Sequence, residues 1–501
     1  MAAPASPSHP FRLSPLEGLM PYAYVRQIYC FPTTNSQAVS ALSRGLSGLA
    51  QDVPYILSRV VSDKSGPGLG VAISARCYNV DDIFSWHDLS ASIDYATLKA
   101  GYFAPGGFET CEIIPPDILP PYQTSLAVFH ARVSLVNGGL ILCVAVHHVV
   151  SDITGYDALL KIWAAHCRDG SSRTIGFDPS WMIRDPLFSA PRSSSDLLSM
   201  PNLLHAIPLG ESARSTSPSQ AVSIEQKNYQ TVIFYFPQQH LRTLKDVVNE
   251  FITSHEPGSW VSTNDILSSL LWSAVIEAQE HSYHDTNQEV VAKDGRMSTL
   301  SFPVQFRSVL RPPLPREFLG AAFLMTNARV PHKDVCLISK SIVQSKPAPQ
   351  TQAETDVLAS SADIPILAKV ALAIRRSIRK IDDAAVRGVI VYLETHLGAN
   401  LESSIILGPP RYDAGGSWTS VVSWADQFVY EVDWGDAVGH CDAVRLPKMK
   451  NKRDPIVLPR VPSLHGYDGG LEVIMSYDVN VMERLIEGPI MRQFAVLRCL
   501  S

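Results

Sequence analysis

Several features that mark other classes of protein are missing from this chain. Its eight cysteines form no CxxC pair and no other spacing of metal ligands, which indicates free thiols in a reducing compartment. No stretch reaches about 18 uninterrupted apolar residues, and the first residues contain neither a basic region nor an apolar one. The sequence therefore predicts a cytoplasmic protein with no membrane span and no secretion signal.

An excess of positive charge is missing as well. The chain has 42 Lys and Arg against 48 Asp and Glu, a net charge of −6, so it offers no electrostatic footprint for nucleic acid. It also contains no internal repeat of the solenoid type. What remains is an ordinary globular composition, 46% hydrophobic and 18% charged, over a length sufficient for more than one domain.

The order of helical and strand patterns predicts a mixed α/β fold in two halves. We expect an N-terminal domain over residues 1–188, a Ser- and Pro-rich crossover over 189–230, and a C-terminal domain over 231–501. Near the end of the chain, alternation predicts a strand at Gln427–Val432, and helical spacing predicts one helix at Val481–Leu497.

The stretch Gly138–Gly155 is the most informative part of the sequence. Its apolar run, Leu140–Val146, is short and rich in β-branched residues, which predicts a strand buried on both faces. The strand ends at two histidines, and Ser151 and Asp152 then precede the start of a helix. A strand that delivers titratable side chains to its end, just before a helix, is a common place for a site.

The chemistry of this stretch leaves several interpretations open. Neutral histidine accepts a proton near neutral pH, and His148 is the better candidate base, with His147 on the opposite face of the strand. Asp152 could support the backbone, bind an arginine or orient the imidazole as in a catalytic triad. The histidines could instead be structural or surface residues, or metal ligands together with Asp152. Cys143 is best explained as a small buried apolar side chain.

At this point the chain resembles the BAHD-type acyl-CoA-dependent acyltransferases, and within them the fungal members similar to trichothecene 3-O-acetyltransferase. The family's histidine motif appears as HHVVSD, His147–Asp152. Other segments that resemble the fungal members follow in the expected order, and they cover most of the chain: Pro15–Pro32, Ser262–Trp272, Val304–Pro315, Ser423–Gly435 and Val444–Pro447.

The resemblance implies two domains of the chloramphenicol-acetyltransferase type, each a mixed sheet flanked by helices, with a tunnel between them. It implies that His148 is the general base and that Asp152 is a structural residue paired with an arginine. It further implies a monomer that needs no metal and uses acyl-CoA, expected to be acetyl-CoA, as its co-substrate. The resemblance further assigns Ser423 and Trp424 to cofactor binding, and it pairs Asp433 with Arg307 next to Gly435.

Two departures from the family pattern are visible. The glycine that usually follows the motif aspartate is replaced by Ile153, with Gly155 two residues later. In the second signature, Trp434 takes the place of Phe, and the positions of Trp and the last Gly hold Asp436 and Ala437. The first signature is therefore better preserved than the second.

The sequence thus predicts an acyltransferase that moves an acetyl group to a hydroxyl of a terpenoid, alkaloid or polyketide. The alternatives are a condensation-type catalyst that uses a carrier-bound thioester, and a non-catalytic relative that binds ligand. Three basic residues of the second half are candidates for the phosphates of CoA only because anions require cations: Lys369, Arg375 and Arg376. A solvated helix face is the favoured alternative for each of them.

Overall fold

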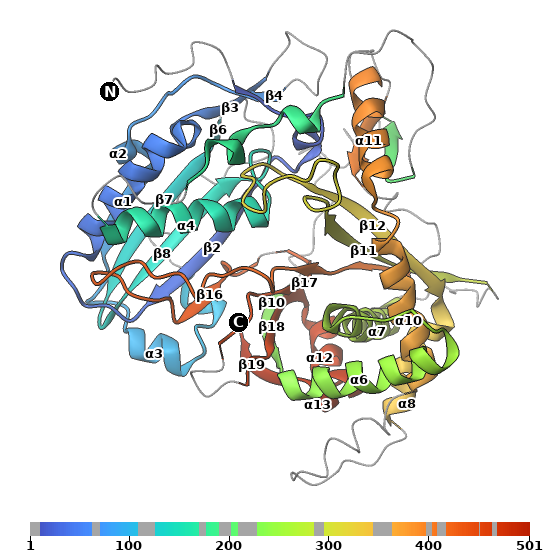
Figure 1. Cartoon of the computed structure of the whole chain (residues 1–501). Coiled ribbons are helices and arrows are strands. Elements are labelled where there is room, and N and C mark those ends of the chain that lie inside the picture. Colours follow the sequence, from blue (N-terminus) through green and yellow to red (C-terminus); the bar gives the residue numbers. More distant parts are fainter. Residues whose placement is uncertain are drawn as a thin grey trace.

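The computed structural model describes most of the chain and shows a mixed α/β molecule in two halves (Figure 1). The described residues are 11–62, 71–108, 126–169, 177–189, 202–208, 228–284, 295–343, 363–396, 403–407, 417–449, 451–462 and 468–501. Within these ranges, no helix combines the length and the apolar character needed to cross a membrane.

A five-stranded sheet organises the first half, in the order β16-β2-β8-β7-β5. The strands are β16 (Ala443–Arg445), β2 (Tyr24–Phe31), β8 (Gly139–His147), β7 (Phe129–Val136) and β5 (Phe84–Asp88). Helices α1 (Ala38–Asp52) and α4 (Ile153–Asp169) cover one face, and α3 (Tyr95–Ala100) lies against the other. Every residue of β8 is buried, which confirms the prediction of a strand buried on both faces.

The second half contains a five-stranded sheet, β15-β17-β18-β10-β19, and a three-stranded sheet, β12-β11-β14. Its helices bury their apolar faces against these sheets in a single large cluster. The strands are β15 (Val422–Ser423), β17 (Arg453–Val457), β18 (Leu471–Asp478), β10 (Tyr229–Phe236), β19 (Val496–Leu500), β12 (Phe323–Pro331), β11 (Met297–Gln305) and β14 (Ser417–Ser420). The helices are α6 (Gln238–His255), α7 (Thr263–His284), α8 (His332–Val343), α10 (Ile364–Ile378), α12 (Val479–Glu487) and α13 (Pro489–Phe494).

Smaller elements are also present among the residues that the structure describes. A four-stranded sheet has the order β1-β4-β3-β6, and a two-stranded sheet joins β13 to β9. The strands are β1 (Phe11–Arg12), β4 (Val71–Ile73), β3 (Arg59–Ser62), β6 (Leu126–Ala127), β13 (Ser403–Leu407) and β9 (Leu204–Pro208), and the remaining α-helices are α2 (Val80–Ile83) and α11 (Asp383–His396).

Three expectations from the sequence require comment. The predicted strand at Gln427–Val432 is wrong, because these residues form turns that leave the sheet. The predicted terminal helix is interrupted: α12 and α13 are separated at Gly488, and the chain then extends into β19, the edge strand beside β10. Most of the predicted crossover, residues 189–230, lies outside the described residues, but β9 within it pairs with β13 of the second half.

Candidate active site

The end of β8 is held by main-chain hydrogen bonds that fix the two histidines. His147 is the register partner of Tyr24 on β2, and its N–H donates to the carbonyl of Val128. The N–H of His148 donates to the carbonyl of Ala23 at 2.8 Å. The strand then turns sharply, so both imidazoles leave a rigid sheet and not a mobile loop.

His147 is a buried structural residue. Its side chain is fully buried, and its ring makes edge contacts with Tyr22 and Tyr24 at centroid distances of 5.7 and 5.3 Å. The N–H of Val149 donates to Nδ1 at 3.3 Å. Burial, followed by the neighbouring His148, lowers the pKa of His147 to about 4, so the ring is neutral at physiological pH.

His148 has different neighbours from those of His147. Its side chain is partly exposed, and its ring centroid is 6.0 Å from that of Phe323 on β12. Desolvation lowers the pKa of His148, although the main-chain carbonyls of His148 and Ser151 and the charge of Asp152 oppose this shift. The ring is therefore neutral near pH 7, which is the form that accepts a proton.

Asp152 forms a buried, two-point ion pair with Arg307 across the two halves. Arg307 Nη1 donates to Oδ2 at 2.8 Å and Nη2 donates to Oδ1 at 2.7 Å, while both side chains are almost fully buried. Burial disfavours the charged carboxylate, but Arg307 and main-chain N–H groups outweigh it and hold the pKa of Asp152 below its usual value. The expected pair of Arg307 with Asp433 is therefore wrong, because both ends of this guanidinium are bound to Asp152.

The same carboxylate begins helix α4. Asp152 Oδ1 accepts hydrogen bonds from the N–H groups of Thr154 and Gly155, and Oδ2 accepts one from Ala322. Gly155 lies so close to the loop before β12 that a Cβ there would come within 2.5 Å of the carbonyl oxygen of Leu319. The glycine two residues after Ile153 is thus required by close approach of the backbone.

A second buried ion pair supports the turn, and no local pattern of residues indicates it. Arg184 Nε donates to Glu17 at 2.9 Å, and its Nη2 donates to the carbonyl of Val150 at 3.3 Å. Glu17 in turn accepts from the N–H of Ala321. Glu17, Arg184 and Val150 are distant in sequence, so only the folded chain reveals that Arg184 holds the turn between His148 and Asp152.

The second signature, Asp433–Ala437, forms a turn that is held by a main-chain hydrogen bond to Asp433 and by the burial of Trp434. Asp433 Oδ1 accepts from the N–H of Gly435 at 2.9 Å, and Gly435 has a φ of +82°, a conformation that favours glycine. Trp434 is buried against Trp163 at a centroid distance of 5.3 Å. Asp436 is exposed and is not among the residues that line the cavity.

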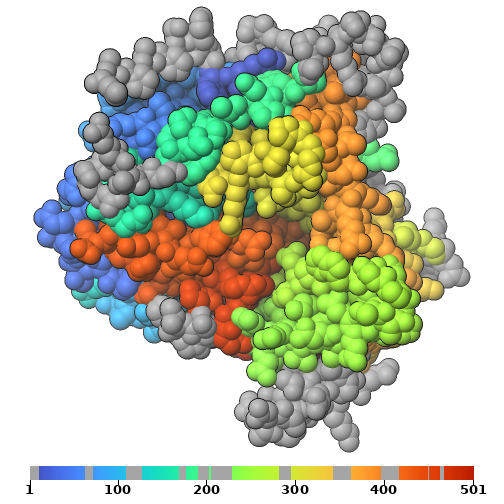
Figure 2. Space-filling model, in the orientation of Figure 1, coloured from blue at the N-terminus to red at the C-terminus, as the bar shows by residue number. Residues whose placement is uncertain are grey.

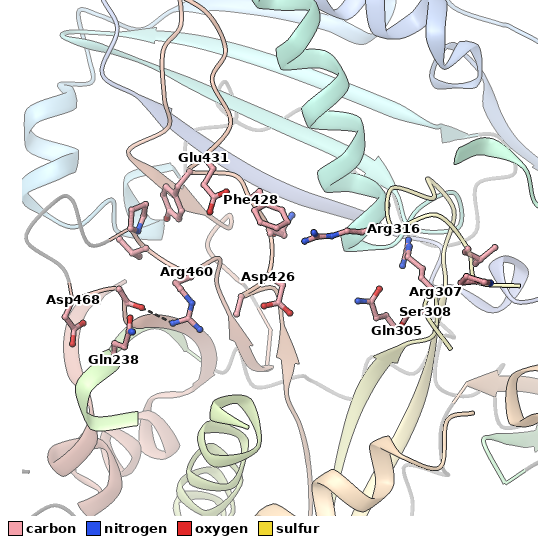
Figure 3. A pocket seen from close by; sticks show the side chains of 18 residues that line it. Gln238, Gln305, Arg307, Ser308, Arg316, Asp426, Phe428, Glu431, Arg460 and Asp468 are labelled. Atoms are coloured by element: carbon pink, nitrogen blue, oxygen red, sulfur yellow. Dashed lines mark hydrogen bonds between the residues drawn. The ribbon is translucent and has the colours of Figure 1, made fainter. Parts of the chain in front are cut away.

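A cavity of about 890 Å³ is lined by Arg307 but not by His148 or Asp152, and Figure 3 shows its lining. One side is formed by Gln305, Arg307 and Ser308 at the end of β11, and the opposite side includes Arg460 and Asp468. Residues 425–431, which follow Ser423 and Trp424, form a third wall. The two residues assigned to cofactor binding therefore lie next to the cavity and do not line it.

The wall at residues 425–431 is attached to the first half of the molecule. Gln27 on β2 donates from Nε2 to Gln427 Oε1 at 2.8 Å, and the N–H of Phe428 donates to Asp157 on α4. The Phe428 ring lies 4.1 Å from Lys161 Nζ and 4.5 Å from Arg316 Cζ, a cation–π arrangement. The cavity is thus built by segments that are fixed to both halves.

The guanidinium groups at the cavity are not those that the sequence suggested. Arg316 and Arg460 are exposed and line the cavity, and Arg460 donates to the carbonyl of Gly469 at 2.9 Å. In Figure 3, Arg316 points towards Phe428 across the opening. The three earlier candidates do not line this cavity and form ion pairs elsewhere: Lys369 with Asp334, Arg375 with Asp265 and Arg376 with Glu256.

Comparison with known proteins places this arrangement in a family. The model of the Transferase family matches residues 116–486, and that of the trichothecene 3-O-acetyltransferase-like N-terminal domain matches residues 22–167. The chain therefore belongs to the Transferase family and is an enzyme. It is 25% identical to the O-acetyltransferase ptmV of Penicillium ochrochloron, with 97% of each chain covered. It is 24% identical to the O-acetyltransferase astG of Aspergillus oryzae, with 85% and 90% covered.

The fold is also similar to solved structures. TRI101 of Fusarium graminearum, in complex with coenzyme A and deoxynivalenol, matches with a TM-score of 0.72 and 18% identity, covering 98% of this chain and all of the other. Vinorine synthase matches with a TM-score of 0.58 and 14% identity, covering 99% of this chain and 96% of the other. These likenesses confirm the predicted fold class.

Proposed function

We propose that this protein is an acetyl-CoA-dependent O-acetyltransferase that acts on a hydroxyl group of a small secondary metabolite, with His148 as the general base. The observation that carries the proposal is the position of His148: a neutral, partly exposed imidazole on a rigid strand end, beside the elements that line the cavity. Its neighbour Phe323 is the register partner of Gln305, which lines the cavity. Arg307, which also lines the cavity, holds Asp152 in the same turn.

The proposed reaction needs one proton acceptor and an activated acyl donor. The neutral His148 ring removes the proton of the acceptor hydroxyl while its oxygen attacks the thioester carbonyl. The tetrahedral intermediate then collapses, the C–S bond breaks, and the imidazolium returns the proton to the sulfur of the departing CoA. Because the thioester is already reactive, this route requires no metal ion.

Asp152 acts in this proposal as a positioning residue and not as a triad member. Its two oxygens are occupied by Arg307 and by main-chain N–H groups, and its charge favours the imidazolium of His148 only from a distance. The ion pair fixes the turn that carries His148. It also fixes the loop between β11 and β12, residues 306–322, against the first half of the molecule.

The cavity is the proposed site for part of the acyl-CoA. Guanidinium groups bind phosphate oxygens with two parallel hydrogen bonds, and Arg316 and Arg460 are both exposed at the cavity wall. The matched TRI101 structures contain coenzyme A together with a small acceptor, which supports a similar arrangement here. The relatives named O-acetyltransferases support transfer to oxygen.

The test is the replacement His148→Ala. We expect the turnover of acetyl-CoA with its acceptor to fall about 10²- to 10⁴-fold, the typical contribution of a general base, with little change in thermal stability. The acceptor is found by incubating the purified enzyme with acetyl-CoA and an extract of metabolites, and then by detecting the acetylated product with mass spectrometry.

His87→Ala is the matched control, because His87 is an exposed histidine on β5 and lies outside the site. This variant should retain full activity. Near-normal turnover by a folded His148→Ala protein would exclude His148 as the base. Activity with an acyl-carrier protein but none with free acetyl-CoA would instead favour the condensation-type reaction.

A further inference from the structure

Three side chains with metal-binding chemistry converge in the helical layer of the second half. Glu280 lies on α7, His332 is the first residue of α8, and Cys336 follows one turn later on the same helix (Figure 1). One ligand atom from each lies within 4.8 Å of the others. None of the three lines the cavity described above. We infer that Glu280, His332 and Cys336 form a site for a divalent transition-metal ion, best matched by Zn²⁺, with one coordination position left for water.

The distances between the ligand atoms are close to those of a zinc tetrahedron. With Zn–S near 2.3 Å and Zn–N and Zn–O near 2.0 Å, the tetrahedral edges from sulfur to nitrogen and to oxygen are both about 3.5 Å. In the structure, Cys336 Sγ is 3.4 Å from His332 Nε2 and 3.6 Å from Glu280 Oε2. His332 Nε2 and Glu280 Oε1 are in direct contact, and an ion would separate this pair by a small side-chain movement.

The nitrogen ligand, His332, and the oxygen ligand, Glu280, are each oriented by a further hydrogen-bond partner. His332 Nδ1 lies 2.8 Å from Ser417 Oγ on β14, so the opposite nitrogen, Nε2, is directed at Glu280 and Cys336. Arg296 Nη1 donates to Glu280 Oε1 at 2.8 Å, which leaves Oε2 for the ion. Outer partners of this kind fix the ligand orientation in metal sites and contribute to their affinity.

The site is also accessible and chemically selective. The side chains of Glu280 and His332 are 26% and 13% exposed, so an ion can reach them from solvent. One thiolate, one imidazole and one carboxylate suit Zn²⁺, whereas Mg²⁺ and Ca²⁺ prefer oxygen ligands alone. A bound ion would connect α7 to α8 and, through Ser417, to the three-stranded sheet.

Titration of the full-length protein with Co²⁺ and Zn²⁺ tests the inference. We expect one equivalent of Co²⁺ to bind with release of the thiol proton and with a thiolate-to-cobalt charge-transfer band, and Zn²⁺ to displace Co²⁺ with loss of that band. Zn²⁺ should raise the midpoint of thermal unfolding. Cys336→Ser and His332→Ala should weaken Zn²⁺ binding by at least about 100-fold, and Ser417→Ala by about 10-fold, as expected for loss of an outer partner.

Cys77→Ser is the control, because Cys77 is an exposed cysteine on a segment of the first half. This variant should bind Zn²⁺ as the unmodified protein does. Equal Zn²⁺ affinity of the unmodified protein and the conservative Cys336→Ser variant, or the absence of the charge-transfer band, would overturn the inference. In that case the three side chains form a hydrogen-bonded ion cluster with Arg296 and no metal site. The test does not depend on acetyltransferase activity, so it stands apart from the proposed function.

Discussion

The two signature segments, His147–Asp152 and Asp433–Ala437, each contain an aspartate beside a sharp turn, but the two carboxylates have different tasks. Asp152 is buried and bound by a guanidinium from the other half of the molecule. The Asp433 carboxylate accepts a hydrogen bond from the main chain two residues later. The second segment is instead anchored by an aromatic side chain, Trp434, in the core of the first half.

This difference predicts which amino-acid substitutions each segment tolerates. A buried ion pair requires both partners, because the loss of one leaves a charge in a medium that solvates it poorly. A local turn can lose its carboxylate and retain most of its contacts. Most departures from the family pattern, at Trp434, Asp436 and Ala437, occur in the second segment. The departure at Ile153 directly follows the first segment, whose ion pair is complete.

Arg307→Met should have the largest effect. It leaves the Asp152 carboxylate buried without its cation, so we expect the free energy of unfolding to fall by about 3–5 kcal/mol. Denaturation with guanidinium chloride measures this change. A decrease below about 1 kcal/mol would mean that the main-chain N–H groups alone hold the carboxylate, as in Asp433, and the contrast between the segments would disappear.

A lower pH should reduce the stability of the protein by an intermediate amount, through His147 in the first signature segment. The folded pKa of His147 is about 4, below the ordinary value of 6.5. Between these values the unfolded chain binds a proton that the folded protein excludes, so stability falls as the pH is lowered. From pH 7 to pH 5 this amounts to about 2 kcal/mol, at 1.36 kcal/mol for each unit below 6.5.

His147→Asn removes this titration and should flatten the dependence by that amount, as measured by unfolding at the two pH values. The shift of His148 has the same sign, so a smaller dependence should remain in the variant. An unchanged slope in His147→Asn would show that the buried ring does not control the acid sensitivity of this segment.

The smallest effect is expected for Asp433→Ala. The lost carboxylate makes a hydrogen bond with the main chain, and a bond of this kind contributes about 1 kcal/mol. Thermal unfolding compared with Arg307→Met gives the ranking directly. A loss for Asp433→Ala as large as that for Arg307→Met would refute the proposed division between a bridging and a local carboxylate.

The local parts of the fold were predictable from the sequence. Strand β8, for example, follows from its short apolar run rich in β-branched residues. The end of the chain was predicted less well, because Gly488 and Pro489 divide the expected helix. The spacing of apolar residues alone does not distinguish β19 from the end of a helix, because β19 is a strand through its pairing with β10.

The site was predictable only where it is continuous in the chain. His148 and Asp152 lie on one turn, but the assignment of one as base and the other as structural residue follows from the family resemblance and not from the residues alone. Asp152 does pair with an arginine, but the partner of Arg307 was misassigned to Asp433, because spacing along the chain does not say which of two carboxylates a distant arginine reaches. No local sequence pattern indicates the Glu17–Arg184 pair or the cluster at Glu280, because both join segments that are distant in the chain.

One feature of the first sheet bears on how the protein is made. Strand β16 belongs to the last part of the chain, yet it pairs with β2 and forms an edge of the first sheet. A ribosome must synthesise nearly nine-tenths of the 501 residues before Ala443–Arg445 appear, and until then the apolar flank of β2 has no neighbouring strand on that side. During most of translation, the free edge of β2 can therefore pair with a wrong strand. The first sheet is complete only when Ala443–Arg445 have paired with β2.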